Sequence, residues 1–210
     1  REVISWDHFS WGNNVYDKAL EWSKIIDDLM KQYSSENKKL AIDVCDPAGI
    51  NALNNNYEYE IINAQKFMEI ARSIKSQDEI MCMKASVKTA EKGILLMHEN
   101  LKAGMTEEEL WSILHKTNIE NGGEWFETRL LNSGPKTNPW FQECSNRIIQ
   151  EGELIAFDTD MVGPYGYCAD ISRTFVEGKK LSNYQNKIHS LAYENVKYNE
   201  QLIKPGVSFR

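Results

Sequence analysis

Three aspartates lie close together in the second half of the chain, at a spacing that suits a metal ion. Asp158 and Asp160 directly follow a short apolar run, and Asp170 lies in a second strand-like stretch, 167–176. Side chains alternate across a strand, so Asp158 and Asp160 are expected to project from one face. Gly and Pro residues between the two stretches predict a turn. A hairpin centred on Pro164 would pair Asp158 with Asp170 and place all three carboxylates together.

Three carboxylates on one face repel one another unless a positive charge lies among them. Opposed residues on antiparallel strands have Cβ atoms roughly 4.5–5.5 Å apart, where like charges are destabilising. Oxygen ligands suit hard or borderline divalent cations, so the pattern favours Mn²⁺, Fe²⁺ or Mg²⁺, with Zn²⁺ as a further candidate. Arg173 lies three residues beyond Asp170 and is expected on the opposite face. Two other interpretations stay open: an exposed, solvated acidic hairpin, and a simple DxD motif such as nucleotide-sugar transferases carry.

The histidines do not complete this set of ligands. His8, His98, His115 and His189 are all far from the aspartates in the sequence. Because three carboxylates alone do not make a catalytic metal site, the remaining ligands are expected beyond Arg210. We therefore expect the chain to be a fragment that is inactive alone.

Hydrophobic spacing predicts the elements that must position the aspartates. Apolar residues three and four apart predict a long helix over 77–101, and Thr106 with Glu109 forms a capping box that begins a second helix. The earlier part of the chain alternates helix and strand, with helices at 15–30 and 47–53 and strands at 39–44 and 57–62. We predict two domains, which are the C-terminal part of an α/β domain at 1–76 and a partial α+β domain at 77–210.

A weak internal repeat suggests that the second domain is pseudo-symmetric. The segment LKAGMT at 101–106 is similar to IKPGVS at 203–208, and a helical pattern precedes each copy. Self-similarity of this kind is typical of a domain built from two related halves. The alternative is a coincidence between two helix connections. If the repeat is real, the second half is truncated in this chain.

Composition excludes several classes of function. The chain has 210 residues, 41% of them apolar, and a net charge of -7, so it can bury a core but offers no basic stripe for nucleic acid. No apolar run approaches the ~20 residues needed to span a bilayer. The four cysteines are widely spaced without a CxxC pair, which favours reduced thiols and a cytoplasmic location.

The aspartate hairpin resembles the metal-binding hairpin of the pita-bread superfamily, which includes aminopeptidase P, prolidase, methionine aminopeptidase and creatinase. The similarity extends from about residue 72 to the end, and the preceding residues are similar to the tail of a creatinase-type N-terminal α/β domain. The resemblance implies a pseudo-symmetric α+β pita-bread fold, here truncated in its second half. It also implies that a His and two Glu from that half complete a pair of metal ions.

Three segments narrow the resemblance to the dimethylsulfoniopropionate lyases of the DddP type: 138–144, 156–160 and 163–170. These lyases use three aspartates at this spacing, which implies that Asp158, Asp160 and Asp170 are metal ligands. The resemblance further implies two divalent ions per site, with iron favoured over manganese or zinc, and a homodimer. The implied reaction converts a small sulfonium substrate, dimethylsulfoniopropionate, to dimethyl sulfide and acrylate. The lyases' catalytic residues would lie beyond Arg210, so no catalytic residue is assigned here.

An Xaa-Pro aminopeptidase or dipeptidase is the alternative function. The peptidases keep a histidine about seventeen residues before the first metal aspartate, whereas the stretch 138–143 contains none. This change would remove a donor that stabilises a tetrahedral intermediate. Trp140 could instead bind the substrate as an aromatic wall for a sulfonium, as could Phe141, or both could pack beneath the hairpin. Some pita-bread domains are non-catalytic binding modules, but these typically lose metal ligands.

Overall fold

The computed structural model describes residues 14–34 and 36–208. They divide into two compact units between Lys75 and Ser76. The first unit contains three helices and a two-stranded sheet, and the second contains three helices and two three-stranded sheets. Each unit is described separately below.

The first unit is built around a β-α-β arrangement. Strands β1 (Lys39–Ile42) and β2 (Glu60–Asn63) are parallel, and helix α2 (Pro47–Asn56) connects them. Asp46 caps α2 by accepting a hydrogen bond from the Ala48 N–H, and Pro47 occupies the first turn as predicted. Helix α1 (Val15–Ser34) packs against α2. Helix α3 (Gln65–Ser73) was not predicted from the sequence, and none of its residues is buried.

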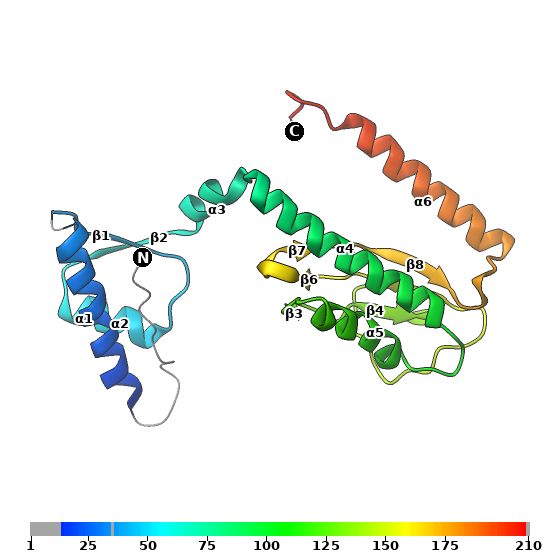
Figure 1. Cartoon of the computed structure of the whole chain (residues 1–210), viewed down its shortest axis with the longest axis horizontal. Coiled ribbons are helices and arrows are strands. Elements are labelled where there is room, and N and C mark those ends of the chain that lie inside the picture. Colours follow the sequence, from blue (N-terminus) through cyan, green and yellow to red (C-terminus); the bar gives the residue numbers. More distant parts are fainter. Residues whose placement is uncertain (1–13, 35, 209–210) are drawn as a thin grey trace. The chain divides into compact units, whose positions relative to one another are not determined.

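Two packed helices form one layer of the second unit (Figure 1). Helix α4 (Gln77–Asn100) confirms the predicted long helix, and helix α5 (Glu107–Glu120) begins at the predicted capping box. The helices approach closely at Gly93, where a Cβ atom would lie 2.5 Å from Leu114 Cδ1. A larger residue at this position would require the Leu114 side chain to move.

The other layer consists of two antiparallel sheets. One has the order β4 (Leu131–Ser133), β5 (Leu154–Phe157), β8 (Arg173–Val176), and the other has the order β3 (Trp125–Phe126), β6 (Met161–Val162), β7 (Cys168–Ala169). The prediction of one continuous strand over 167–176 is therefore wrong. The chain leaves the ladder at residues 170–172, and β7 and β8 belong to different sheets.

A single apolar core joins the helices to the sheets. Burying a large apolar side chain contributes roughly 1.5–3 kcal/mol, so this cluster supplies much of the stabilisation of the second unit. Its largest fully buried members are Met97, Leu110, Leu114, Leu131, Ile149, Ile155, Phe157 and Met161. Phe157 is the last residue of β5, so the core reaches directly to the first aspartate of the predicted site.

The last helix, α6 (Asn183–Leu202), has no buried residue. It begins with a capping box of Ser182 and Gln185, as α4 does with Ser76 and Glu79. The segments that follow α4 and α6 also agree, because each contains a left-handed glycine, Gly104 with φ 91° and Gly206 with φ 84°. These shared local features support the internal repeat seen in the sequence.

The described helices do not include one with the length and apolar character that a membrane crossing requires. All four cysteines are free thiols, and Cys144 is buried in the core.

Candidate metal centre

The three predicted aspartates converge in the structure. Asp158, Asp160 and Asp170 each offer a carboxylate oxygen, and these atoms all lie within 4.8 Å of one another. Asp158 and Asp160 are half-buried, and Asp170 is exposed. The geometric condition for a shared cation is therefore met, while the role of the three side chains as metal ligands stays a prediction.

The register of the hairpin differs from the one predicted. Phe157 lies opposite Arg173 and Met161 lies opposite Ala169, so the turn is centred on Tyr165. The same register places Asp160 across from Asp170, and the predicted pairing of Asp158 with Asp170 is wrong. The reason is local: Pro164 begins a 3₁₀ turn (Pro164–Gly166) and does not form its centre.

A kink in the backbone, and not a continuous strand, brings the carboxylates of Asp158 and Asp160 together. Strand β5 ends at Phe157, and β6 begins at Met161. Between them Asp160 has φ 34°, a left-handed conformation that Asp tolerates better than most residues. The simple alternation of strand faces therefore does not apply to residues 158–160, although their carboxylates still meet.

Two threonines orient the carboxylates, and neither was predicted from the sequence. Asp158 Oδ1 accepts a hydrogen bond from the Thr159 N–H at 3.0 Å, and Asp160 Oδ2 accepts one from the Thr128 hydroxyl. The Thr159 hydroxyl donates to the Ala169 carbonyl at 2.9 Å and accepts from the Ile171 N–H at 2.9 Å. Each aspartate is thus fixed either directly or through its neighbours in the chain.

The electrostatics of the cluster fit a divalent cation. A hydrogen bond with Asp158 raises the pKa of Asp170 to about 6, with burial and the charges of Asp158, Asp160 and Glu127 adding to the effect. The raised pKa reflects the crowding of the carboxylates, which makes loss of the Asp170 proton less favourable. A divalent ion would offset the same repulsion, and a donor set made entirely of oxygen atoms suits a hard or borderline metal.

Arg173 and three of the four histidines have described surroundings outside the cluster. Arg173 lines a shallow groove with residues of α4, including Glu91 and Leu95, in agreement with its predicted position away from the carboxylates. His98 contacts the ring of Phe175, and His115 stacks on Phe126. His189 belongs to α6, and His8 lies outside the described residues. Within 14–34 and 36–208, the metal-compatible group contains aspartates alone.

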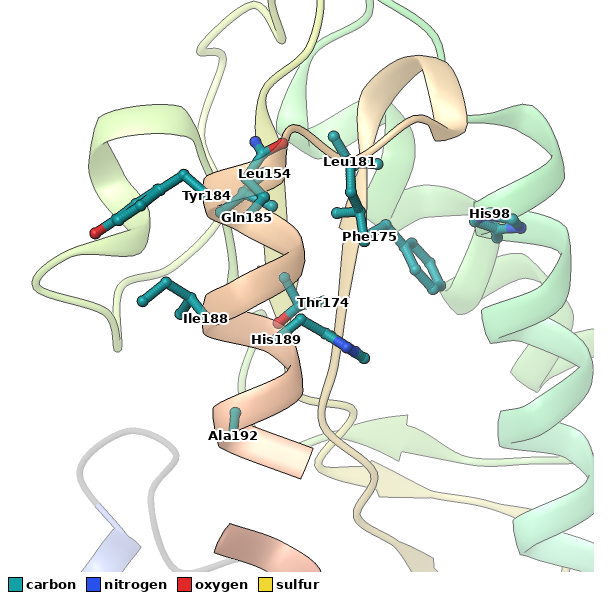
Figure 2. Close-up of a pocket in the computed structure, with 11 residues that line it drawn as sticks. His98, Leu154, Thr174, Phe175, Leu181, Tyr184, Gln185, Ile188, His189 and Ala192 are labelled. Carbon is teal, nitrogen blue, oxygen red and sulfur yellow. The ribbon is translucent and has the colours of Figure 1, made fainter. Parts of the chain in front are cut away.

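A larger groove lies between α6 and the β5–β8 edge of the sheet. Figure 2 shows His98, Phe175 and His189 around this groove, which has a volume of about 470 Å³. Most of its remaining lining is apolar, including Leu154, Leu181 and Ile188. None of the three aspartates lines it. Among the described residues, the three aspartates alone form a group of side chains that could hold a metal ion, and the pKa of Asp170 within it is raised, so we take this cluster as the candidate site.

The loop that carries Trp140 is joined to the cluster at its base. Leu130 forms an isolated bridge with Glu143, and its carbonyl accepts the Asp158 N–H at 3.0 Å. Trp140 is 36% exposed and contacts Phe141 edge-on at 6.1 Å between ring centroids. Phe141 is 71% exposed, so it does not pack beneath the hairpin.

A buried carboxylate fixes the ends of the same loop. Glu107 has no exposed surface. Its carboxylate accepts hydrogen bonds from the backbone N–H and the hydroxyl of both Ser133 and Ser145. It also forms an ion pair with Lys136 at 2.8 Å. Burial alone would raise the pKa of Glu107, but Lys136 and the two serines outweigh it and hold the pKa below the ordinary value. The buried Asn132 closes the loop by bonding both backbone groups of Gln142.

Comparison with known proteins identifies the family. The sequence pattern of metallopeptidase family M24 matches residues 81–210. The chain belongs to metallopeptidase family M24. Members of this family use divalent metal ions, and the cluster of Asp158, Asp160 and Asp170 lies within the matched region. The predicted relationship to the pita-bread enzymes is therefore confirmed.

Curated relatives within the M24 family include two dimethylsulfoniopropionate lyases. DddP from Roseovarius nubinhibens is 39% identical over 208 residues, which cover 96% of this chain and 46% of the relative. DddP from Roseobacter denitrificans is 37% identical over 207 residues, which cover 95% of this chain and 46% of the relative. The chain thus spans about half the length of the curated relatives it matches.

Solved structures of M24 peptidases share the fold. A putative aminopeptidase P from Bacillus anthracis aligns with a TM-score of 0.74 at 25% identity, over 90% of this chain and 47% of that one. The X-Pro aminopeptidase of Thermotoga maritima aligns with a TM-score of 0.67 at 22% identity, over 83% and 49%. The predicted α+β pita-bread fold is confirmed, and the chain corresponds to about half of these structures.

Proposed function

We propose that this M24 protein is a metal-dependent lyase that cleaves dimethylsulfoniopropionate to dimethyl sulfide and acrylate. The observation that carries the proposal is the convergence of three aspartates within 4.8 Å in a chain that is 37–39% identical to two DddP lyases. Asp158, Asp160 and Asp170 are the proposed metal ligands, and iron is the favoured metal. The proposed assembly is a homodimer.

The reaction requires one proton and one leaving group to depart. A base removes a proton from the carbon next to the substrate carboxylate, the C–S bond breaks, and its electron pair leaves with sulfur as neutral dimethyl sulfide. The remaining three carbons form acrylate. A bound divalent ion would offset the negative charge that develops near the substrate carboxylate.

Residues of this chain support the proposal at two points. The aspartate cluster places three carboxylate oxygens within 4.8 Å of one another, close enough to bind a common ion. Trp140 and Phe141 present exposed aromatic surface on a loop whose base adjoins Asp158. An aromatic face attracts a sulfonium through its quadrupole, and we propose Trp140 as the substrate contact. The absence of histidine from 138–143 favours the lyase over a peptidase.

The test uses the full-length protein loaded separately with Fe²⁺, Mn²⁺ or Zn²⁺. Each sample is incubated with dimethylsulfoniopropionate and, in parallel, with an Xaa-Pro dipeptide. We expect acrylate and dimethyl sulfide in equal amounts and no dipeptide cleavage. Dipeptide hydrolysis without acrylate release would establish the Xaa-Pro peptidase alternative, which the shared fold alone supports. Metal analysis and light scattering measure the ion content and the proposed dimer.

A further inference from the structure

We infer that Thr159 is a positioning residue of the metal centre, whose hydroxyl fixes Asp170 relative to Asp158 and Asp160. This inference rests on the proposed metal-binding function. Thr159 lies between Asp158 and Asp160 in the sequence and has no exposed surface. Its hydroxyl contacts backbone groups on either side of Asp170, so it would act through the backbone that carries the ligands.

The inference starts from the gap between the two sheets. Strands β5 and β8 remain paired as far as Phe157 and Arg173, and β6 and β7 resume pairing at Met161 and Ala169. The intervening residues belong to neither ladder. In an uninterrupted ladder of this register, Thr159 would lie opposite Ile171 and would bond to it through the backbone.

The Thr159 side chain makes hydrogen bonds in place of the missing backbone pair between Thr159 and Ile171. Its hydroxyl donates to the Ala169 carbonyl and accepts from the Ile171 N–H, each at 2.9 Å. These two groups flank Asp170 on either side. A hydroxyl can donate and accept at once, so it reproduces both halves of a peptide contact.

The backbone of Thr159 is used for a second purpose. Its N–H donates to Asp158 Oδ1 at 3.0 Å, so it is directed at a ligand and not across the ladder. One residue therefore orients the Asp158 carboxylate with its backbone and holds the segment that carries Asp170 with its side chain. Loss of the hydroxyl would leave the Ile171 N–H without this acceptor and would allow Asp170 to move away from the other two carboxylates.

The substitution Thr159→Val removes the hydroxyl and preserves the shape of the side chain. In the full-length protein we expect the affinity for Mn²⁺ to fall by about 10–100-fold, the range typical when a group that orients a metal ligand is lost. The affinity is measured from the electron paramagnetic resonance signal of free Mn²⁺, which is independent of turnover. Thr159→Ser retains the hydroxyl and is expected to bind Mn²⁺ within about threefold of the unmodified protein.

A matched control separates positioning from general stability. Thr117 is also buried, and its hydroxyl donates to the Ile113 carbonyl at 2.7 Å on helix α5. Thr117→Val should lower the melting temperature without changing the affinity for Mn²⁺. If Thr159→Val binds Mn²⁺ as tightly as the unmodified protein, or if Thr159→Ser loses as much affinity as a variant without the hydroxyl, the inference is wrong.

Two further results are interpretable. Should Thr159→Val fail to fold, Thr159→Ala replaces it in the comparison with Thr159→Ser, and equal affinities in that pair would refute the inference. If the unmodified full-length protein itself does not bind Mn²⁺ or Fe²⁺, the proposed function fails, and the inference fails with it. A failure confined to the Thr159 variants leaves the proposed function standing.

Discussion

Replacement of the buried Glu107 by Gln should destabilise the second unit strongly. The side chain keeps its shape, but an NH₂ group replaces one carboxylate oxygen that is surrounded by hydrogen-bond donors. Glu107 Oε2 accepts from Lys136 Nζ at 2.8 Å and from Ser145 N and Oγ at 3.0 and 2.8 Å. An amide nitrogen cannot accept these bonds, and Lys136 loses its anionic partner.

The expected loss of stability follows from the burial of the ion pair between Glu107 and Lys136. Removing one partner of a buried ion pair costs about 3–5 kcal/mol, because the other charge stays uncompensated. The Lys136 side chain is 24% exposed, so water can relieve part of this cost and the lower end of the range applies. A loss of about 3 kcal/mol corresponds to a fall in melting temperature of ~6–12 °C for a domain of this size.

The pH dependence provides a second check on the same substitution. The pKa of Glu107 is lower in the folded protein than its ordinary value of 4.5. Its contribution to stability is therefore complete above about pH 4.5 and disappears as the pH falls through the lower, folded pKa. The difference in unfolding free energy between the unmodified protein and Glu107→Gln should shrink in acid, because protonated Glu107 also loses its charge.

The assay is urea unfolding of the full-length protein, followed by tryptophan fluorescence at pH 7 and at decreasing pH. Glu108→Gln is the matched control, since Glu108 is the exposed neighbour in the same helical turn. Loss of the Glu108 charge removes a favourable interaction with the helix dipole that is worth less than about 1 kcal/mol. If Glu107→Gln is no less stable than Glu108→Gln at pH 7, the buried carboxylate does not hold the loop as described.

Two other predictions concern the metal centre and the aromatic loop. Asp160→Asn should preserve the fold, because Asn also tolerates φ 34°. It should weaken Mn²⁺ binding by more than the ~10–100-fold that is typical when a residue next to the ligands is changed. Unchanged affinity in a Mn²⁺ titration would show that Asp160 is not a ligand. Trp140→Ala should raise the KM for dimethylsulfoniopropionate by ~2–30-fold with a smaller change in kcat, as expected for a cation–π contact of about 0.5–2 kcal/mol. A KM equal to that of the unmodified enzyme would indicate that Trp140 has a packing role.

The helices of the second unit that follow local patterns could be predicted from the sequence. Apolar spacing located α4, and the capping box of Thr106 and Glu109 marked the start of α5. Both signals are local, since they depend on residues one helical turn apart. The convergence of the three aspartates was also predicted correctly, although the strand alternation and the register from which it was argued do not hold in the structure.

The remaining details depend on contacts that local patterns do not encode. The register of the hairpin depends on the turn at Pro164–Gly166, and moving its centre by one residue shifts the strand pairing by two. The role of Glu107 depends on Ser133, Lys136 and Ser145, which lie in a different part of the chain. The sequence analysis assigned no role to Thr159, because its hydroxyl contacts arise only where the two sheets separate.

The lack of buried residues in α6 has a consequence for the dynamics of residues 1–210 studied on their own. The apolar residues Ile188, Leu191 and Val196 of α6 are 47%, 53% and 64% exposed. A helix of this length with little packing is marginally stable in water. In that chain, the amide hydrogens of α6 should therefore exchange with solvent faster than those of α4, which packs against α5.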